Sequence, residues 1–255
     1  MIAEMFDLTG QIAFITGSSR GIGLGIAEAL ADAGAEVVLN SRNPDKLAEV
    51  QKDLLSKGYK AHVVAFDVTD GKAVTEGIAK IEKDIGPIDI LINNAGIQRR
   101  APFVDIPEEA WRAVMETNLN AVFFVAQAVS RNMVKRQSGK IVNICSLASE
   151  VGRPTIVPYT TAKGAVRMLT KGMCCELAGH GIQVNGIGPG YFKTELNTDL
   201  FENKEFNDWV CSRTPAKRWG NMDELKGVAV FLASEASSFV NGQILYVDGG
   251  LLSGM

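Results

Sequence analysis

The chain has 255 residues, of which 46% are hydrophobic and 22% charged, a composition typical of a soluble globular protein with a well-filled core. Its 26 Lys and Arg residues against 29 Asp and Glu residues leave a formal charge of −3, so we expect no nucleic-acid partner and no binding to an anionic membrane. No apolar stretch approaches the ~20 residues that cross a bilayer, and no basic segment precedes a long apolar one at the amino terminus. We therefore expect a cytoplasmic protein.

The cysteine and histidine content argues against a disulfide scaffold and a metal centre. The four cysteines lack C-x-x-C spacing and are too sparse for a disulfide framework, so we expect reduced thiols. His62 and His180 are the only histidines, and neither belongs to a cluster of ligand residues. We expect no dedicated transition-metal site.

A glycine-rich corner follows the first apolar run of the chain. Residues 12–15 are typical of a buried strand, and the segment 16–23 that follows has the spacing G-x-x-x-G-x-G before helical periodicity begins. Glycines at a strand-to-helix corner let the backbone approach a pyrophosphate, which the free N–H groups and the dipole of the helix would then hold. This segment predicts a dinucleotide site.

The rest of the chain alternates between apolar runs and helical periodicity. Further strands are expected at residues 36–39, 62–66, 88–92, 140–144, 183–187 and 244–247. Helices are expected at residues 44–56, 71–83, 107–135 and 159–177. This alternation predicts one α/β domain over residues 1–255, a Rossmann-type doubly wound sheet of seven mainly parallel strands with helices on both faces. Its ligand crevice would lie at the carboxyl ends of the strands.

The end of the second predicted strand indicates which dinucleotide is preferred. An NAD site usually has an acidic residue here that binds the adenosine ribose, but this chain has Ser41 and Arg42 and no carboxylate. With Arg20 of the glycine-rich segment, these side chains suit a ribose phosphate, because guanidinium forms paired, charge-assisted hydrogen bonds with phosphate. We expect NADP(H) to be preferred over NAD(H).

Tyr159 and Lys163 are spaced one helical turn apart, so both side chains would project from the same face of a helix. An ammonium beside a phenol favours the phenolate, which makes tyrosine useful for proton transfer. Ser146 follows the predicted strand 140–144 and would reach the same crevice.

Together, these motifs resemble the short-chain dehydrogenase/reductase family. The resemblance spans the chain and rests on residues 16–23, Asn93-Asn94-Ala95-Gly96, Asn118, Ser146, Tyr159, Lys163 and Pro189-Gly190. It implies hydride transfer between a nicotinamide and a carbonyl or secondary alcohol. Tyr159 would be the acid and base, Ser146 would bind the substrate oxygen, Lys163 would hold the nicotinamide ribose and act on Tyr159, and Asn118 would position a water for proton relay.

The expected cofactor contacts combine the resemblance with the residues discussed above. They are Gly17, Ser19, Arg20, Gly21, Ile22, Gly23, Ser41, Arg42, Asp67, Val68, Asn94, Ala95, Gly96, Tyr159, Lys163, Pro189, Gly190 and Thr194.

The expected substrate is a small sugar acid, because several segments resemble family members that act on such compounds. Arg99 or Arg100 would pair with a carboxylate and Glu150 would accept hydrogen bonds from hydroxyls; the other expected substrate contacts are Ser146, Tyr159 and Tyr191. Residues 191–218 would cover the crevice. The resemblance also implies a homotetramer built from the two long central helices and the carboxyl-terminal segments.

Other readings stay open at this level. They are a family member that acts at another carbon of a related sugar acid, a 3-oxoacyl-carrier-protein reductase, and a module that senses NADP without turnover.

Overall fold

The computed structural model describes residues 1–194 and 198–254. Its centre is a seven-stranded sheet in the order β3-β2-β1-β4-β5-β6-β7, in which every neighbouring pair is parallel. The strands are β1 (Ile12–Ile15), β2 (Glu36–Leu39), β3 (Ala61–Val63), β4 (Ile90–Asn93), β5 (Gly139–Ile144), β6 (Ile182–Pro189) and β7 (Ile244–Val247). The predicted doubly wound α/β fold is confirmed.

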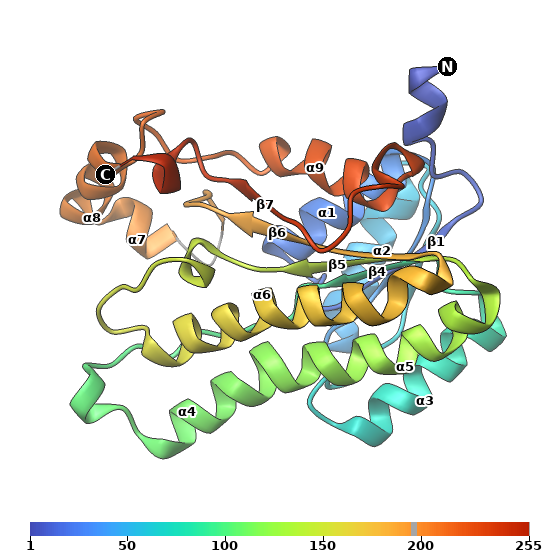
Figure 1. Cartoon of the computed structure of the whole chain (residues 1–255), viewed down its shortest axis with the longest axis horizontal. Coiled ribbons are helices and arrows are strands. Elements are labelled where there is room, and N and C mark those ends of the chain that lie inside the picture. Colours follow the sequence, from blue (N-terminus) through green and yellow to red (C-terminus); the bar gives the residue numbers. More distant parts are fainter. Residues whose placement is uncertain (195–197, 255) are drawn as a thin grey trace.

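Helices cover both faces of the sheet (Figure 1). They are α1 (Gly21–Asp32), α2 (Pro44–Ser56), α3 (Gly71–Asp84), α4 (Glu108–Met115), α5 (Ala121–Arg136), α6 (Val157–Leu177), α7 (Thr198–Glu202), α8 (Lys204–Arg213) and α9 (Asp223–Ala233). Helices α1, α2 and α9 pack on one face, and α3, α5 and α6 pack on the other. Among the described residues, no helix has the length and apolar character needed to span a membrane.

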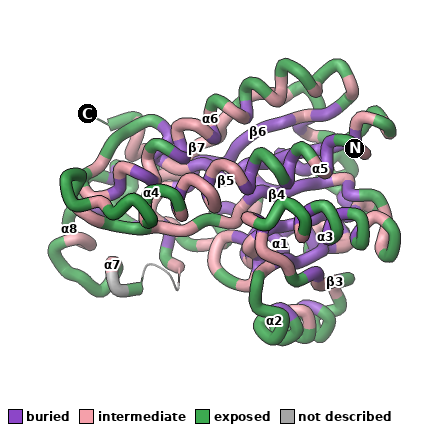
Figure 2. The backbone as a smooth tube through the Cα atoms, turned by 90° about the horizontal axis from the view of Figure 1, so that it is seen from below, coloured by how far each residue is buried: buried purple, intermediate pink, exposed green. Residues whose placement is uncertain are grey.

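Alternation along each strand divides the core into two layers. In β1, Ala13 and Ile15 belong to the layer under α1 and α9, whereas Ile12 and Phe14 belong to the layer under α3 and α5. Successive side chains of a strand point to opposite faces, so a strand buried on both faces is apolar along most of its length. Figure 2 shows the result, with buried strands inside and exposed backbone on the outer helices.

Several predicted boundaries differ from those observed because tertiary pairing determines them. The third strand ends at Val63 instead of residue 66, since its partner β2 ends at Leu39, which pairs with Val63. The sixth strand continues to Pro189, which pairs with Val247 of β7. The helix expected at 107–135 is two α-helices joined by a π-helical turn, Glu116–Asn120. Helix α9 was not among the predicted elements.

The strand order reverses between β1 and β4. From β1 the sheet continues through β2 to β3, and from β4 it continues in the other direction through β5 and β6 to β7. In doubly wound sheets, ligands bind outside the carboxyl ends of the strands at such a point. The segments after β1, β4, β5 and β6 therefore meet at one edge.

Candidate functional site

The glycine-rich loop after β1 is joined to the segment after β4 by a set of hydrogen bonds. The buried hydroxyl of Thr16 accepts hydrogen bonds from the N–H groups of Asn94 (3.0 Å) and Ala95 (3.1 Å). The side-chain amide of Asn94 donates to the carbonyls of Thr16 and Gly17, both at 3.0 Å. Asn94, predicted as a cofactor contact, therefore uses its amide N–H groups to brace the loop.

Two glycines of this loop are required by close packing. A Cβ on Gly17 would lie 2.8 Å from the Cα of Ala95, and one on Gly23 would lie 2.6 Å from the carbonyl oxygen of Gly17. Gly17 also has a φ of +64°, which side chains rarely adopt. The close approach of these backbones leaves the amino terminus of α1 at the crevice. The side chain of the N-cap residue, Arg20, forms no capping hydrogen bond with the first turn of the helix. Uncapped N–H groups at a helix start can bind a phosphate.

The predicted phosphate-binding side chains lie after β2, the neighbour of β1, and at the start of α1. Arg42 is exposed, and its Nη1 lies 3.8 Å from Oδ2 of Asp67, which follows β3. The other oxygen of Asp67 accepts hydrogen bonds from the backbone and hydroxyl of Thr69. The hydroxyl of Ser41 donates to the carbonyl of Asn43, so it supports its own turn. Arg20 is exposed at the start of α1.

Ser146, Tyr159 and Lys163 come together after β5. Lys163 is 4% exposed, its ammonium donates to the carbonyl of Ile144, and its Nζ lies 5.7 Å from the centre of the Tyr159 ring. The hydroxyl of Ser146 accepts a hydrogen bond from the N–H of Ala148 at 3.1 Å. Because this bond uses a lone pair, the Ser146 proton can be donated to a ligand oxygen.

Asn118 lies in the π-helical turn and is fully buried. Its Oδ1 accepts from the N–H of Ile97 at 2.8 Å, and its Nδ2 donates to the carbonyl of the same residue at 2.9 Å. The turn therefore ties the long helical segment to the chain after β4, next to Gly96, whose added Cβ would lie 3.5 Å from Asn118 Oδ1. The side chain of Asn118 braces this loop, and its expected role in positioning a water stays a prediction.

Two of the predicted substrate residues, Arg100 and Glu150, have different surroundings. Arg100 lies within electrostatic range of Tyr159, Tyr191 and Arg153, and its pKa is lowered first by burial and then by the charge of Arg153. Oε1 of Glu150 instead accepts a hydrogen bond from the hydroxyl of Tyr246 at 2.7 Å and forms a salt bridge with Nε of Arg167, also at 2.7 Å. Both partners contact Oε1, so the other carboxylate oxygen keeps its acceptor capacity, and the expected role of Glu150 toward substrate hydroxyls stays a prediction.

The other predicted cofactor contacts lie on the segments that meet at the crevice. Ser19 is in the glycine-rich loop, Gly21 and Ile22 begin α1, Val68 follows β3, and Pro189 ends β6. The N–H of Gly190 donates to the carbonyl of Val247 at 2.8 Å. Thr194 is the last described residue before the gap at 195–197, and the segment 191–218, which is expected to cover the crevice, therefore lies partly outside the described residues.

A family model described as enoyl-(acyl carrier protein) reductase matches residues 17–252 of the chain. The crystal structure of a short-chain type dehydrogenase/reductase from Mycobacterium marinum matches with a TM-score of 0.94 at 37% identity, covering 98% of this chain and 99% of that one. The chain belongs to the short-chain dehydrogenase/reductase family.

Two more similar members of the short-chain dehydrogenase/reductase family have names that refer to a sugar acid. The chain is 58% identical over 248 residues to the gluconate 5-dehydrogenase of Gluconobacter oxydans, with 97% of each chain covered. The crystal structure of a gluconate 5-dehydrogenase from Burkholderia cenocepacia in complex with NADP and tartrate matches with a TM-score of 0.98 at 55% identity, covering 100% of both chains.

Sequence reasoning missed three side chains of this short-chain dehydrogenase/reductase. Ser18 accepts from the N–H of Asn40 at 3.0 Å and so joins the glycine-rich loop to β2. Ser149 donates to the carbonyl of Lys163 at 2.9 Å. Arg153 donates to the hydroxyl of Tyr191 at 3.2 Å. Ser18 and Ser149 lie beside predicted residues, but nothing in the local pattern distinguishes Arg153 from a surface arginine.

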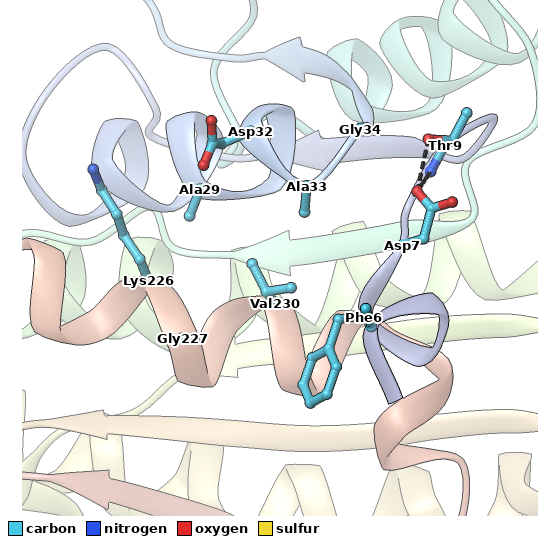
Figure 3. A pocket seen from close by; sticks show the side chains of 11 residues that line it. Phe6, Asp7, Thr9, Ala29, Asp32, Ala33, Gly34, Lys226, Gly227 and Val230 are labelled. Carbon is cyan, nitrogen blue, oxygen red and sulfur yellow. Dashed lines mark hydrogen bonds between the residues drawn. The ribbon is translucent and has the colours of Figure 1, made fainter. Parts of the chain in front are cut away.

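A separate hollow of about 630 Å³ lies away from these residues, between the amino-terminal turn, α1 and α9 (Figure 3). Its charged groups already have partners: Asp7 accepts from Thr9, Asp32 from Tyr59, and Lys226 pairs with Asp223. It lies near Thr9 and Gly34, before β1 and β2, and so at the amino ends of the strands. The crevice at the carboxyl ends, with Tyr159 and Lys163, is the candidate active site of this short-chain dehydrogenase/reductase.

Proposed function

We propose that the protein is an NADP-dependent gluconate 5-dehydrogenase that interconverts D-gluconate and 5-keto-D-gluconate. The observation that carries this proposal is the meeting of Ser146, Tyr159 and the buried Lys163 next to the cationic Arg100. The names of the two similar gluconate 5-dehydrogenases support the choice of sugar acid.

The residues of the crevice fit a dinucleotide. The uncapped start of α1 would hold the pyrophosphate, and Arg42 and Arg20 would hold the 2′-phosphate of the adenosine ribose. The NADP in the Burkholderia cenocepacia structure supports this choice, and the absence of an acidic residue after β2 supports a preference over NAD. When bound, the nicotinamide ring supplies or accepts the hydride.

The side chains around the reacting carbon would then move one proton. In the direction of reduction, Tyr159 donates its phenolic proton to the oxygen of the substrate carbonyl, and in oxidation it takes that proton back. Ser146 donates a hydrogen bond to the same oxygen and stabilises its developing charge. The Lys163 ammonium, 5.7 Å from the centre of the Tyr159 ring, binds the nicotinamide ribose. Asn118 keeps the loop after β4 in place.

We further propose that residues 1–255 act as one catalytic domain, that residues 191–218 cover the substrate, and that the protein is a cytoplasmic homotetramer. The exposed aromatic residues Phe123 and Phe124 of α5 support the assembly, because large exposed apolar patches mark interfaces.

Replacement of Tyr159 by Phe tests the proposed chemistry. We expect Tyr159→Phe to lower kcat for 5-keto-D-gluconate reduction by about 10²- to 10⁴-fold, because the general acid is lost. The NADPH dissociation constant should change little. The measurements are steady-state NADPH oxidation and a fluorescence titration of NADPH. Intact turnover in this variant would refute the assigned role of Tyr159.

A substrate panel tests the choice of sugar acid. Wild-type kcat/KM should be highest for 5-keto-D-gluconate, compared with 2-deoxy-3-keto-D-gluconate and an acetoacetyl thioester. A higher kcat/KM for either competitor would mean that the competitor, and not 5-keto-D-gluconate, is the substrate. If NADPH binds but none of the three compounds oxidises it, the protein would instead be an NADP sensor.

A further inference from the structure

The loop between Ser146 and Tyr159 is attached to the loop that carries Arg100. The N–H of Ala101 donates to the carbonyl of Thr155 at 3.1 Å. Thr155 itself has a φ of +69°, an uncommon conformation for a β-branched residue, which is held only where the surroundings stabilise it. Arg153 and Arg100 each lie two positions or fewer from this connection, so the two loops bring two guanidinium groups toward one place.

Aromatic side chains hold Arg153 from one side. Its guanidinium carbon lies 4.4 Å from the centre of the Phe206 ring and 5.2 Å from that of Trp209, two rings of α8 that stack on each other at 5.6 Å. Its Nη1 donates to the hydroxyl of Tyr191, whose ring lies edge-on to both of the others. A planar guanidinium fixed in this way is preorganised and loses less entropy on binding an anion.

The charges around these two arginines are unbalanced. Neither Arg100 nor Arg153 forms an ion pair with a carboxylate of residues 1–194 or 198–254. Glu150, the acidic residue of the same loop, pairs with Arg167 instead. The positive charge of Arg153 also lowers the pKa of Arg100. A bound anion would relieve the repulsion between two cations that share a partly desolvated site.

We propose that Arg153 and Arg100 together bind the carboxylate of the sugar-acid substrate, and that helix α8 supports this subsite by holding Arg153 against Phe206 and Trp209. The inference rests on the proposed function. It assigns the specificity of the enzyme for an acidic substrate partly to Arg153, a residue that the sequence analysis did not identify. Arg100 lies within electrostatic range of both Arg153 and Tyr159, so the carboxylate would be held while the far end of the substrate faces Tyr159 and Ser146.

The test compares an acidic and a neutral substrate in the full-length protein. We expect Arg153→Gln to lower kcat/KM for 5-keto-D-gluconate by about 10- to 100-fold, mainly through KM, and to weaken inhibition by tartrate at least about tenfold. For the neutral ketose L-sorbose, kcat/KM should change less than about threefold. Arg131→Gln, which removes an exposed arginine of α5, controls for the loss of one positive charge. Equal losses for both substrates would overturn the proposal, because they would indicate a purely structural role.

A second pair of variants keeps the proposal testable if Arg153→Gln folds poorly. Arg100→Gln should show the same selective loss for the acid, and the double variant should lose less than the product of the two single effects, since both residues bind one group. Fully multiplicative effects, or unchanged inhibition by tartrate in Arg100→Gln, would contradict a shared carboxylate site.

Failure of this inference can be separated from failure of the proposed function. If the wild-type protein reduces none of the keto sugar acids, the proposed substrate is wrong. Calorimetric titration of tartrate into the NADP-saturated protein then still decides the anion site, because binding that is lost in Arg153→Gln supports the site and binding that is unchanged refutes it.

Discussion

The polar side chains around the crevice differ in how much hydrogen-bonding capacity they have left. Asn94, Asn118 and Ser149 use theirs to hold backbone groups of neighbouring loops. The hydroxyl of Ser146 accepts a hydrogen bond from Ala148, which leaves its own proton free to be donated, and the hydroxyl of Tyr159 forms no hydrogen bond with another described residue. Residues of the first kind keep the loops in place, and those of the second kind are available to substrate.

Arg42 offers the most direct test of cofactor choice at the residue scale. We expect Arg42→Ala to raise the dissociation constant of NADPH by about 10- to 100-fold and that of NADH by less than about threefold, because only NADPH carries the phosphate that the guanidinium binds. Fluorescence titrations with both cofactors measure this. Equal losses for the two cofactors would remove the argument for an NADP preference.

Lys140 of β5 is buried, and its Nζ has no hydrogen-bond partner among the described residues. Burial lowers its pKa, partly offset by the charge of Glu235. Because the folded state holds this proton less tightly than the unfolded chain, stability should rise with pH from the lowered pKa toward the ordinary lysine pKa of 10.5. Lys140→Met should therefore stabilise the protein at neutral pH by about 1–3 kcal/mol.

Thermal unfolding at several pH values between neutrality and pH ~10 checks the Lys140 prediction. The exposed Lys60→Met is the matched control, and it should leave the unfolding midpoint nearly unchanged. A lower midpoint for Lys140→Met than for the wild type would show that the ammonium contributes favourably.

At the scale of elements, the glycine-rich loop and the segment after β4 form one packed unit. The same contacts that bring Gly17 against Ala95 place the start of α1 at the crevice. The cofactor site therefore depends on the packing of two loops as well as on the flexibility of glycine.

Gly23→Ala tests this dependence. Its new Cβ would meet the amide of Asn94 and the carbonyl of Gly17, so we expect a loss of about 1–3 kcal/mol in stability and at least about tenfold weaker NADPH binding. Gly227→Ala in α9, where no atom lies within 4 Å of the new Cβ, should instead stabilise the protein by about 0.5–1 kcal/mol. Normal NADPH affinity in Gly23→Ala would refute the idea of a tightly packed unit.

At the scale of the whole molecule, the helices of one sheet face retain an exposed apolar surface. Phe123 and Phe124 of α5 are 41% and 45% exposed, and Met168 of α6 is 58% exposed. The opposite sides of α5 and α6 are buried in the core, so these residues face outward. Such a surface supports association between copies of the chain.

Light scattering coupled to size exclusion tests the proposed tetramer. We expect the wild-type mass to equal four chains of 27.4 kDa and Phe124→Glu to give a smaller species, because a charge would be buried in the interface. Leu55→Glu, at an exposed apolar position of α2, should leave the mass unchanged. A monomeric wild-type protein would end the proposal.

Much of the fold could be predicted because its determinants are local. Apolar runs and helical periodicity located the seven strands to within a few residues, and alternation of strand and helix indicated the parallel sheet. The π-helical turn at Glu116–Asn120 could not be predicted, since its bonds between Asn118 and Ile97 join residues far apart in the chain. The end of β3 likewise depends on where its partner β2 ends.

The candidate site likewise combines features set by local sequence with features set by contacts between distant residues. The spacing of Tyr159 and Lys163 and the glycine-rich loop are sequence properties, because helix geometry and backbone freedom act over a few residues. That Arg100 comes within electrostatic range of Tyr159 and Arg153, and that Glu150 pairs with Arg167, was decided only by the tertiary structure. Side-chain direction in loops depends on distant partners such as Phe206 and Tyr191, and no local pattern encodes those contacts.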